Sequence, residues 1–341
     1  MIELKKNVVQ GFKAGAVMAG IKKQDRPDLA LIYSETPAVC AAVFTRNKVK
    51  AAPVLLSMLV AKKGRARAII ANSGNANACN GAQGMQDALT MATLAAEGLD
   101  IDTSDVFVAS TGVIGAPMPM DRVEAGIRAL PAELREDGLV DASRAIMTTD
   151  TFHKIYGVSE TIGGREVSIV GMAKGSGMIN PDMATMLSFV MTDAAIEKKA
   201  LRSALKDAVD NSFNCITVDG DTSTNDCVIA LANGRAGNAV IREGGSGYRK
   251  FREALEAVLL KLAKSVVKDG EGATKLVELA VEGAADEKDA AKAAKTIANS
   301  PLVKTALFAA DANWGRIMAA AGRSGAKMDP GKAEVWLFDA G

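Results

Sequence analysis

The chain has 341 residues, and its 41 Lys and Arg nearly balance its 40 Asp and Glu, which leaves a formal net charge of +1. This balance lacks the basic surface expected of a general nucleic-acid-binding protein. No apolar run approaches the roughly 20 residues that a membrane-spanning helix needs. Charges and glycines interrupt the N-terminal segment before a signal-peptide core could form. We therefore expect neither a membrane nor a nucleic acid as partner.

Histidine and cysteine usage narrows the possible chemistry. Because His153 is the single histidine, a two-histidine metal site is excluded, and an enzyme of this sequence would need a base other than imidazole. The cysteines are scattered and form no C-x-x-C pair; they are Cys40, Cys79, Cys215 and Cys227. Such thiols favour a reducing, cytoplasmic setting over a disulfide framework or a zinc site. We expect no metal and no cofactor.

Short apolar segments alternate with amphipathic ones along the chain, which predicts a mixed α/β fold with helical layers on sheets. Strands are predicted, in chain order, over residues 29–33, 39–44, 66–71, 106–109, 167–171, 184–191, 227–232, 276–281 and 335–338. Helices are predicted over residues 85–97, 122–130, 198–209 and 248–267.

The glycine-rich stretch 174–177 leads to Thr185, which stands near the start of an apolar run. The ordinary interpretation is a loop that enters a strand, since Thr favours strands. The functional interpretation is that Thr185 Oγ attacks the carbonyl of Ala184, and that an acyl shift with hydrolysis frees Thr185 as a new N-terminus. The freed α-amine would have a pKa of about 7.7–8.0. It could then accept the proton of its own hydroxyl, which activates a nucleophile without histidine.

Residues 110–115 follow a predicted strand and include Thr111 and Gly112. Backbone N–H groups and a hydroxyl in such a turn could face a developing oxyanion, although an ordinary turn has the same pattern. The acidic stretch 218–226 could bind a cation, or it could form capped turns. It is no EF-hand, because Thr224 replaces the required Gly and Ala230 stands at the Glu position.

Three further segments carry candidate ligand groups. Glu271, after the helix-ending Gly270, could hold a substrate ammonium or be a solvated turn carboxylate. The amide-rich turn 72–79 could bind a ligand or cap its own backbone. Arg316 could anchor a carboxylate or make an internal ion pair, and His153 fits a surface or packing role better than that of a base.

Taken together, these stretches resemble the ArgJ family, the ornithine acetyltransferases (glutamate N-acetyltransferases) of arginine biosynthesis. The resemblance extends from about Gly11 to the C-terminus. The segments that carry it are 11–14, 44–47, 72–79, 110–115, 148–151, 174–187, 217–226, 269–274 and 313–316. The most specific is the segment 174–187, in which Lys-Gly-Ser-Gly-Met leads to Met-Ala-Thr-Met-Leu.

The resemblance implies a layered α-β-β-α, N-terminal-nucleophile-like fold that cleaves itself between Ala184 and Thr185. The fragments 1–184 and 185–341 would stay associated, as a heterotetramer of two of each. By matching position, Thr185 is implied as the nucleophile, and Thr111 and Gly112 as the oxyanion hole. Substrate contacts are implied for Thr151, Lys174, Thr185 and Glu271.

The implied reaction moves an acetyl group from N2-acetylornithine to Thr185 and from there to glutamate. Some members of the family also accept acetyl-CoA as donor. A related self-processing aminopeptidase or amidohydrolase, with water as acceptor, is the alternative enzyme, and a non-catalytic amino-acid-binding protein is the alternative from another class. Family members usually continue past 335–338 and end with an Asn and a Thr or Ser at the substrate site. This sequence ends at Gly341, so we expect a C-terminally short second fragment without those groups.

Overall fold

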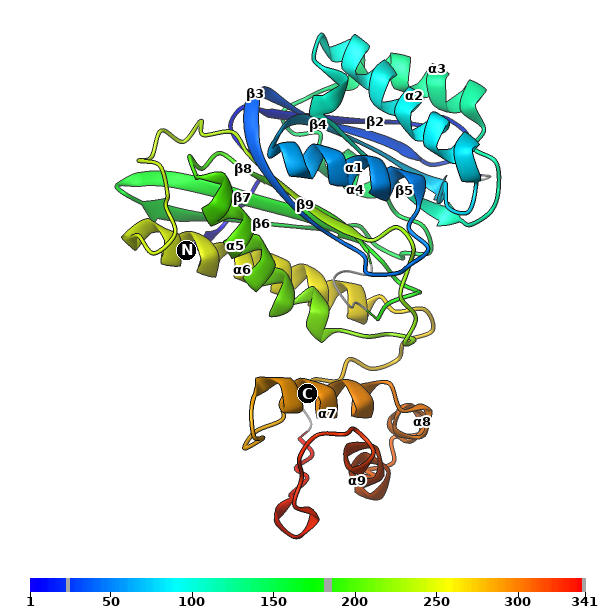
Figure 1. Ribbon diagram of the computed structural model, residues 1–341, viewed down its shortest axis with the longest axis vertical. Coiled ribbons are helices and arrows are strands. Elements are labelled where there is room, and N and C mark those ends of the chain that lie inside the picture. The colour runs from blue at the N-terminus through cyan, green and yellow to red at the C-terminus, as the bar shows by residue number, and fades with distance from the viewer. Residues whose placement is uncertain (23–24, 181–185, 339–341) are drawn as a thin grey trace.

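A computed structural model describes residues 1–22, 25–180 and 186–338 (Figure 1). Within these residues, nine strands form one sheet in the order β1-β6-β7-β8-β9-β3-β4-β5, and β2 pairs with β3. The strands are β1 (Ile2–Glu3), β2 (Phe12–Val17), β3 (Leu29–Phe44), β4 (Arg65–Asn75), β5 (Val106–Val113), β6 (Lys154–Ile162), β7 (Arg165–Lys174), β8 (Leu187–Thr192) and β9 (Cys227–Ala232). The helices are α1 (Ala52–Lys63), α2 (Gly81–Leu99), α3 (Met120–Ala129), α4 (Leu139–Ala145), α5 (Lys198–Asp210), α6 (Ser246–Lys268), α7 (Glu287–Ala298), α8 (Pro301–Phe308) and α9 (Trp314–Gly322).

The long strand β3 joins two leaves of the sheet. Its first part pairs with β2 and β4, and its second part, from Val39 to Phe44, pairs with β9. The register shifts between Tyr33 and Ala38, and such an irregularity bends a strand and increases its twist. The two strands predicted over 29–33 and 39–44 are therefore one strand. The polar residues and Pro37 between them mark a bend and not an end.

Three apolar cores separate four layers. In β9, Val228 and Ala230 belong to the core under α5 and α6, whereas Ile229 and Leu231 belong to the core between the two leaves. This alternation is the period-two pattern of a strand that is buried on both faces. A third core lies between the β3–β5 leaf and helices α2 and α3. Figure 1 shows α2 and α3 on one side of the strands and α5 and α6 on the other. The predicted α-β-β-α layering is thus confirmed.

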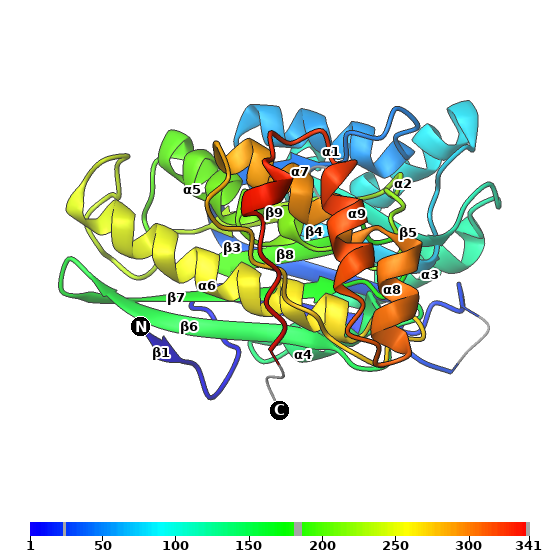
Figure 2. The same cartoon turned by 90° about the horizontal axis from the view of Figure 1, so that it is seen from below.

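Helices α7–α9 form a small separate unit after α6. They share their own core, which includes Ile297, Val303 and Ala320. Seen from below, the unit lies over the α6 side of the body (Figure 2). The Thr217 hydroxyl oxygen lies 2.6 Å from Asn299 Oδ1 and links the unit to the body.

The strands predicted over 276–281 and 335–338 are wrong. Neither segment forms a strand, and both are exposed: Leu276 keeps 44% of its surface and Phe338 keeps 87%. Their apolar pattern fits a strand, but in the described part of the chain no neighbouring strand supplies a hydrogen-bond ladder for them. None of the described helices is long and apolar enough to cross a bilayer.

Candidate active site

The carboxyl ends of β5 and β7 meet the amino ends of β8 and β9. Lys174, the last residue of β7, pairs with Leu187 at the start of β8. Leu187 in turn pairs with Cys227 at the start of β9. Lys174 Nζ donates a hydrogen bond of 3.2 Å to the Thr111 hydroxyl on β5. Two segments that are 63 residues apart in sequence, and that were candidates independently, therefore meet here.

Lys174 is a buried cation, with 7% of its surface exposed. Burial lowers its pKa, because desolvation penalises the ammonium form, while the negative charges of Asp150, Asp226 and Glu271 oppose this effect. Thr111 beside it is partly exposed. A buried ammonium next to an accessible hydroxyl suits the binding of a carboxylate or a polarised carbonyl oxygen.

Gly112 has a backbone that other residues rarely adopt. Its φ is +135°, and an added Cβ would lie 2.3 Å from the carbonyl carbon of Gly74 and 2.6 Å from the nitrogen of Asn75. The neighbouring β4 backbone approaches so closely that no side chain fits at this position. Gly112 is exposed next to Thr111, so the backbone here is open to a ligand.

Thr151 is exposed and is held by Asp269 from the end of α6. The Thr151 backbone N–H donates to Asp269 Oδ2 at 3.0 Å, and the Thr151 hydroxyl donates to Asp269 Oδ1. Lys154 Nζ lies 2.5 Å from Asp269 Oδ2 and 2.7 Å from Asp150 Oδ1. Burial alone would raise the pKa of Asp150, but the charges of Lys174 and Lys154 outweigh burial and hold that pKa at about 2.

Glu271 lies beside the glycine-rich segment. Its N–H donates to the Ser176 carbonyl at 2.9 Å. A Cβ on Gly177 would lie 2.6 Å from Glu271 Oε1, so the carboxylate rests against the Gly177 backbone. The Glu271 side chain is exposed and can meet a cationic group from solvent.

Thr111, Gly112, Thr151, Lys174 and Glu271 are thus gathered around the ends of the strands. Ala184 and Thr185, the predicted cleavage site and nucleophile, lie outside the described residues. The next residue of the chain, Met186, is described, and its carbonyl accepts a 3.0 Å hydrogen bond from the Cys227 N–H.

Sequence reasoning assigned no individual role to four charged residues of this region: Asp150, Lys154, Asp226 and Asp269. Asp150 and Lys154 are four residues apart, which in a sequence is no more than an ordinary charge pair. Asp226 is 2% exposed, its Oδ2 has no hydrogen-bond partner within the described chain, and burial raises its pKa well above the usual value. In the sequence, Asp226 stands out as the last residue of the acidic stretch 218–226, directly before the apolar run of β9.

The acidic stretch 218–226 forms capped turns: Asp219 Oδ1 accepts hydrogen bonds from the N–H groups of Ile179 and Asp221, at 2.9 and 3.0 Å. In the part of the chain outside the gaps at 23–24, 181–185 and 339–341, no group of three or more His, Cys, Asp or Glu could hold a metal. His153 is half-buried, and burial and the nearby charges of Arg144 and Lys154 lower its pKa.

The remaining candidates serve local structure. Asn77 of the amide-rich turn caps its own backbone: its N–H donates to Asn75 Oδ1 at 2.7 Å, and its side-chain amide donates to the Gly84 carbonyl at 2.8 Å. Arg316 Nη1 donates to the Leu302 carbonyl and to Thr305 Oγ1, at 2.9 and 3.2 Å, and no carboxylate of the described residues forms an ion pair with it. These two hydrogen bonds link α9 to α8.

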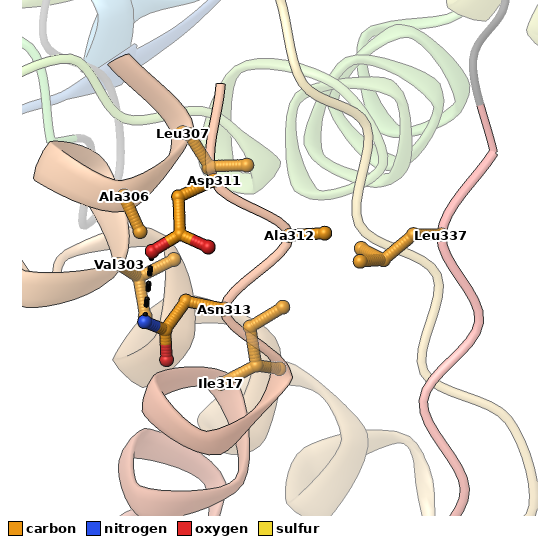
Figure 3. A pocket seen from close by; sticks show the side chains of 8 residues that line it. All are labelled: Val303, Ala306, Leu307, Asp311, Ala312, Asn313, Ile317 and Leu337. Atoms are coloured by element: carbon orange, nitrogen blue, oxygen red, sulfur yellow. Dashed lines mark hydrogen bonds between the residues drawn. The ribbon is translucent and has the colours of Figure 1, made fainter. Parts of the chain in front are cut away.

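Two cavities lie away from the strand ends. The smaller, of about 10 Å³, is lined by residues of α8, of α9, of the connection between them and by Leu337 (Figure 3), and has room for about one water molecule. In it, Asn313 Nδ2 donates to Asp311 Oδ2 at 3.0 Å. The larger, of about 270 Å³, lies between β3, α1 and α5 and includes none of the site residues above.

The fold and the strand ends define a class of protein: a four-layer α/β protein whose strand ends gather hydroxyl, ammonium and carboxylate groups. Residues 13–340 match the sequence profile of the ArgJ family, and the chain belongs to that family. As a member it is an acyltransferase of arginine biosynthesis, in agreement with the prediction from the motifs.

Individual relatives support this membership. The arginine biosynthesis bifunctional protein ArgJ of Symbiobacterium thermophilum is 57% identical over 331 residues, which cover 96% of this chain and 82% of the relative. The protein of that name from Geobacter sulfurreducens is 55% identical, with coverages of 97% and 84%. The crystal structure of ArgJ from Bacillus halodurans is similar with a TM-score of 0.51 and 42% identity, over 54% of this chain and 97% of that chain.

Proposed function

We propose that this protein transfers an acetyl group from N2-acetyl-L-ornithine to L-glutamate through an acetyl ester on Thr185. The observation that carries the proposal is the hydrogen bond between Lys174 and Thr111, which brings the glycine-rich segment to the end of β5. A carboxylate-binding ammonium and an oxyanion-binding turn then lie on one side of the strand ends. Thr151 and Glu271 supply acceptors for a substrate N–H or ammonium group.

Thr185 becomes reactive, in this proposal, when the chain cleaves itself between Ala184 and Thr185. The fragments 1–184 and 185–341 are expected to remain together, because β7 pairs with β8 and β3 pairs with β9 across the cleavage point. Separating the fragments would break the backbone hydrogen bonds of both ladders. We further propose assembly into a heterotetramer of two of each fragment, in the cytoplasm.

Acetyl transfer proceeds in two steps. The Thr185 α-amine takes the hydroxyl proton, and Thr185 Oγ bonds to the acetyl carbonyl carbon. Thr111 and Gly112 stabilise the oxyanion, and the breaking amide bond releases ornithine, whose nitrogen takes the proton. The glutamate amine then attacks the ester, and the Thr185 oxygen leaves and regains a proton. Acetyl-CoA is proposed as a second donor for the first step.

Acetyl transfer with a labelled acceptor tests this function. We expect the wild-type protein to run as two fragments on a denaturing gel and to form labelled acetylglutamate. Thr185→Ala should stay uncut and transfer nothing, whereas Thr161→Ala, at an exposed position on β6, should behave as wild type. Release of free acetate without acetylglutamate would indicate a hydrolase, and transfer by Thr185→Ala would overturn the covalent route.

A further inference from the structure

Lys154 is fully buried between two carboxylates at the start of β6. Its ammonium contacts Asp150 Oδ1 at 2.7 Å, Asp269 Oδ2 at 2.5 Å and the Phe152 carbonyl at 3.3 Å. The side chains of Lys154 and Asp150 have no exposed surface, and that of Asp269 keeps 2%. The three N–H groups of the ammonium are all used, so Lys154 itself has no donor left for a substrate.

Asp150 and Asp269 connect the buried Lys154 to the segments that carry the proposed substrate contacts. Asp150 Oδ1 accepts a 2.7 Å hydrogen bond from the N–H of Gly175, directly after Lys174. The Asp269 carbonyl accepts a 2.6 Å hydrogen bond from Ser176 Oγ. Glu271 follows Asp269 by two residues. The Lys154 ammonium therefore fixes the relative positions of three segments, 150–154, 174–176 and 269–271.

Asp269 also determines in which direction the Thr151 hydroxyl donates its hydrogen bond. A hydroxyl has one proton to donate, and that of Thr151 is directed to the Asp269 carboxylate. The exposed face of the Thr151 hydroxyl therefore offers lone pairs. Together with the exposed Glu271 carboxylate it offers hydrogen-bond acceptors to a ligand, whereas the Lys174 ammonium is a hydrogen-bond donor.

We propose that Asp269, held by Lys154, is a positioning residue that fixes the Thr151 hydroxyl as a hydrogen-bond acceptor for the amino group of an amino-acid substrate. Asp269 does not touch the substrate and acts through Thr151. The inference rests on the proposed function, since it needs an amino acid with separate amino and carboxylate groups in this site.

Asp269→Asn is a nearly isosteric test. Its amide can still accept from Lys154 through oxygen, but it presents an NH₂ group to Thr151, which turns the Thr151 hydroxyl proton outward toward the substrate. We expect the Kd for ornithine, measured by calorimetry, and the KM for acetylornithine to rise by about tenfold or more. We expect kcat to change far less, since the reacting atoms are not touched.

A double-mutant cycle separates this role from a general structural one. Thr151→Val should raise Kd to a similar extent, Thr151→Ser should leave Kd near the wild-type value, and Asp269→Asn should add little in the Thr151→Val background. The control is Asp289→Asn, which removes another largely buried carboxylate, in the first turn of α7, that accepts hydrogen bonds from Lys292 Nζ and the Lys327 N–H. It should leave Kd unchanged.

Failure of the positioning role and failure of the proposed function give different results. Wild-type transfer with an unchanged Kd in Asp269→Asn, or fully additive effects in the cycle, would overturn the positioning role and leave the proposed function intact. A wild-type protein that neither transfers acetyl nor binds ornithine would overturn both. Should Asp269→Asn fail to fold, the comparison of Thr151→Val with Thr151→Ser decides, since equal Kd values for these two variants contradict the acceptor role.

Discussion

Gly112 is a position of the proposed site at which even a single methyl group has no room. An alanine there would place its Cβ against backbone atoms of β4, and its φ of +135° is unfavourable for any side chain. We expect Gly112→Ala to lower the free energy of unfolding by about 2–4 kcal/mol and to abolish acetyl transfer. Urea unfolding and a transfer assay measure the two effects.

Gly115 provides the control for Gly112. It also has a positive φ, of +80°, but nothing lies within 4 Å of an added Cβ. Gly115→Ala should therefore cost only the backbone strain, about 1–2 kcal/mol. Equal losses of stability in the two variants would show that the close approach of β4 to Gly112 does not matter.

The Asp150 carboxyl group makes the free energy of unfolding depend on pH. Its pKa is about 2 in the folded protein against an ordinary value of 3.8, so between these values the unfolded chain binds more protons than the folded one. The stabilisation is present above pH ~4 and is lost as the pH falls toward 2, by about 2 kcal/mol in total. Asp150→Asn should be less stable than wild type at neutral pH, and the difference should shrink by that amount at pH ~2. Denaturant unfolding across this pH range measures it, and a difference that stays constant with pH would contradict the assignment.

Single residues of the site were predictable in part. Thr111 and Lys174 stand next to glycines in turns after predicted strands, and the structure joins them by a hydrogen bond; their catalytic roles remain predictions. Lys154 and Asp269 could not be paired from the sequence, because 115 residues separate them. Only the folding of α6 against β6 and β7 brings the two charges together.

At the scale of elements, α6 gives a direct test of the layer packing. Leu262 is 1% exposed in the core under the sheet, and Leu260 on the other side of the same helix is 39% exposed. Leu262→Ala should lower the free energy of unfolding by about 2–5 kcal/mol. Leu260→Ala should cost well under half as much. Thermal or urea unfolding compares them, and similar costs would contradict the assigned faces of α6.

Where apolar residues recur with a clear period, the predicted bounds of helices and strands lie close to the observed ones. The strand predicted over 227–232 is β9, and the helix predicted over 198–209 is α5, which ends at Asp210. Helix α1 was missed because it lacks a single apolar face: Leu55 and Leu59 are 43% and 66% exposed, while Val54 is buried. For the failed strand at 276–281, local pattern could not report that a pairing partner is missing.

At the scale of the whole molecule, the segment that connects α6 to α7 is the one that we expect a protease to cut first. Residues 270–286 form no helix or strand, and most of them are exposed. Proteases cut such segments before they cut packed elements. We expect trypsin to cleave first after Lys275, and mass spectrometry of the early products measures this. A first cut inside α5, for example after Lys206, would contradict the division into a layered body and a separate C-terminal unit.

The central claim is that acetyl transfer passes through Thr185, and intact mass spectrometry of the protein mixed with acetylornithine tests it most directly. We expect two masses, for residues 1–184 and 185–341, with one acetyl group on Thr185 of the second fragment that disappears when glutamate is added. An uncleaved chain with full transfer activity, or an acetyl group that persists on another residue, would contradict it.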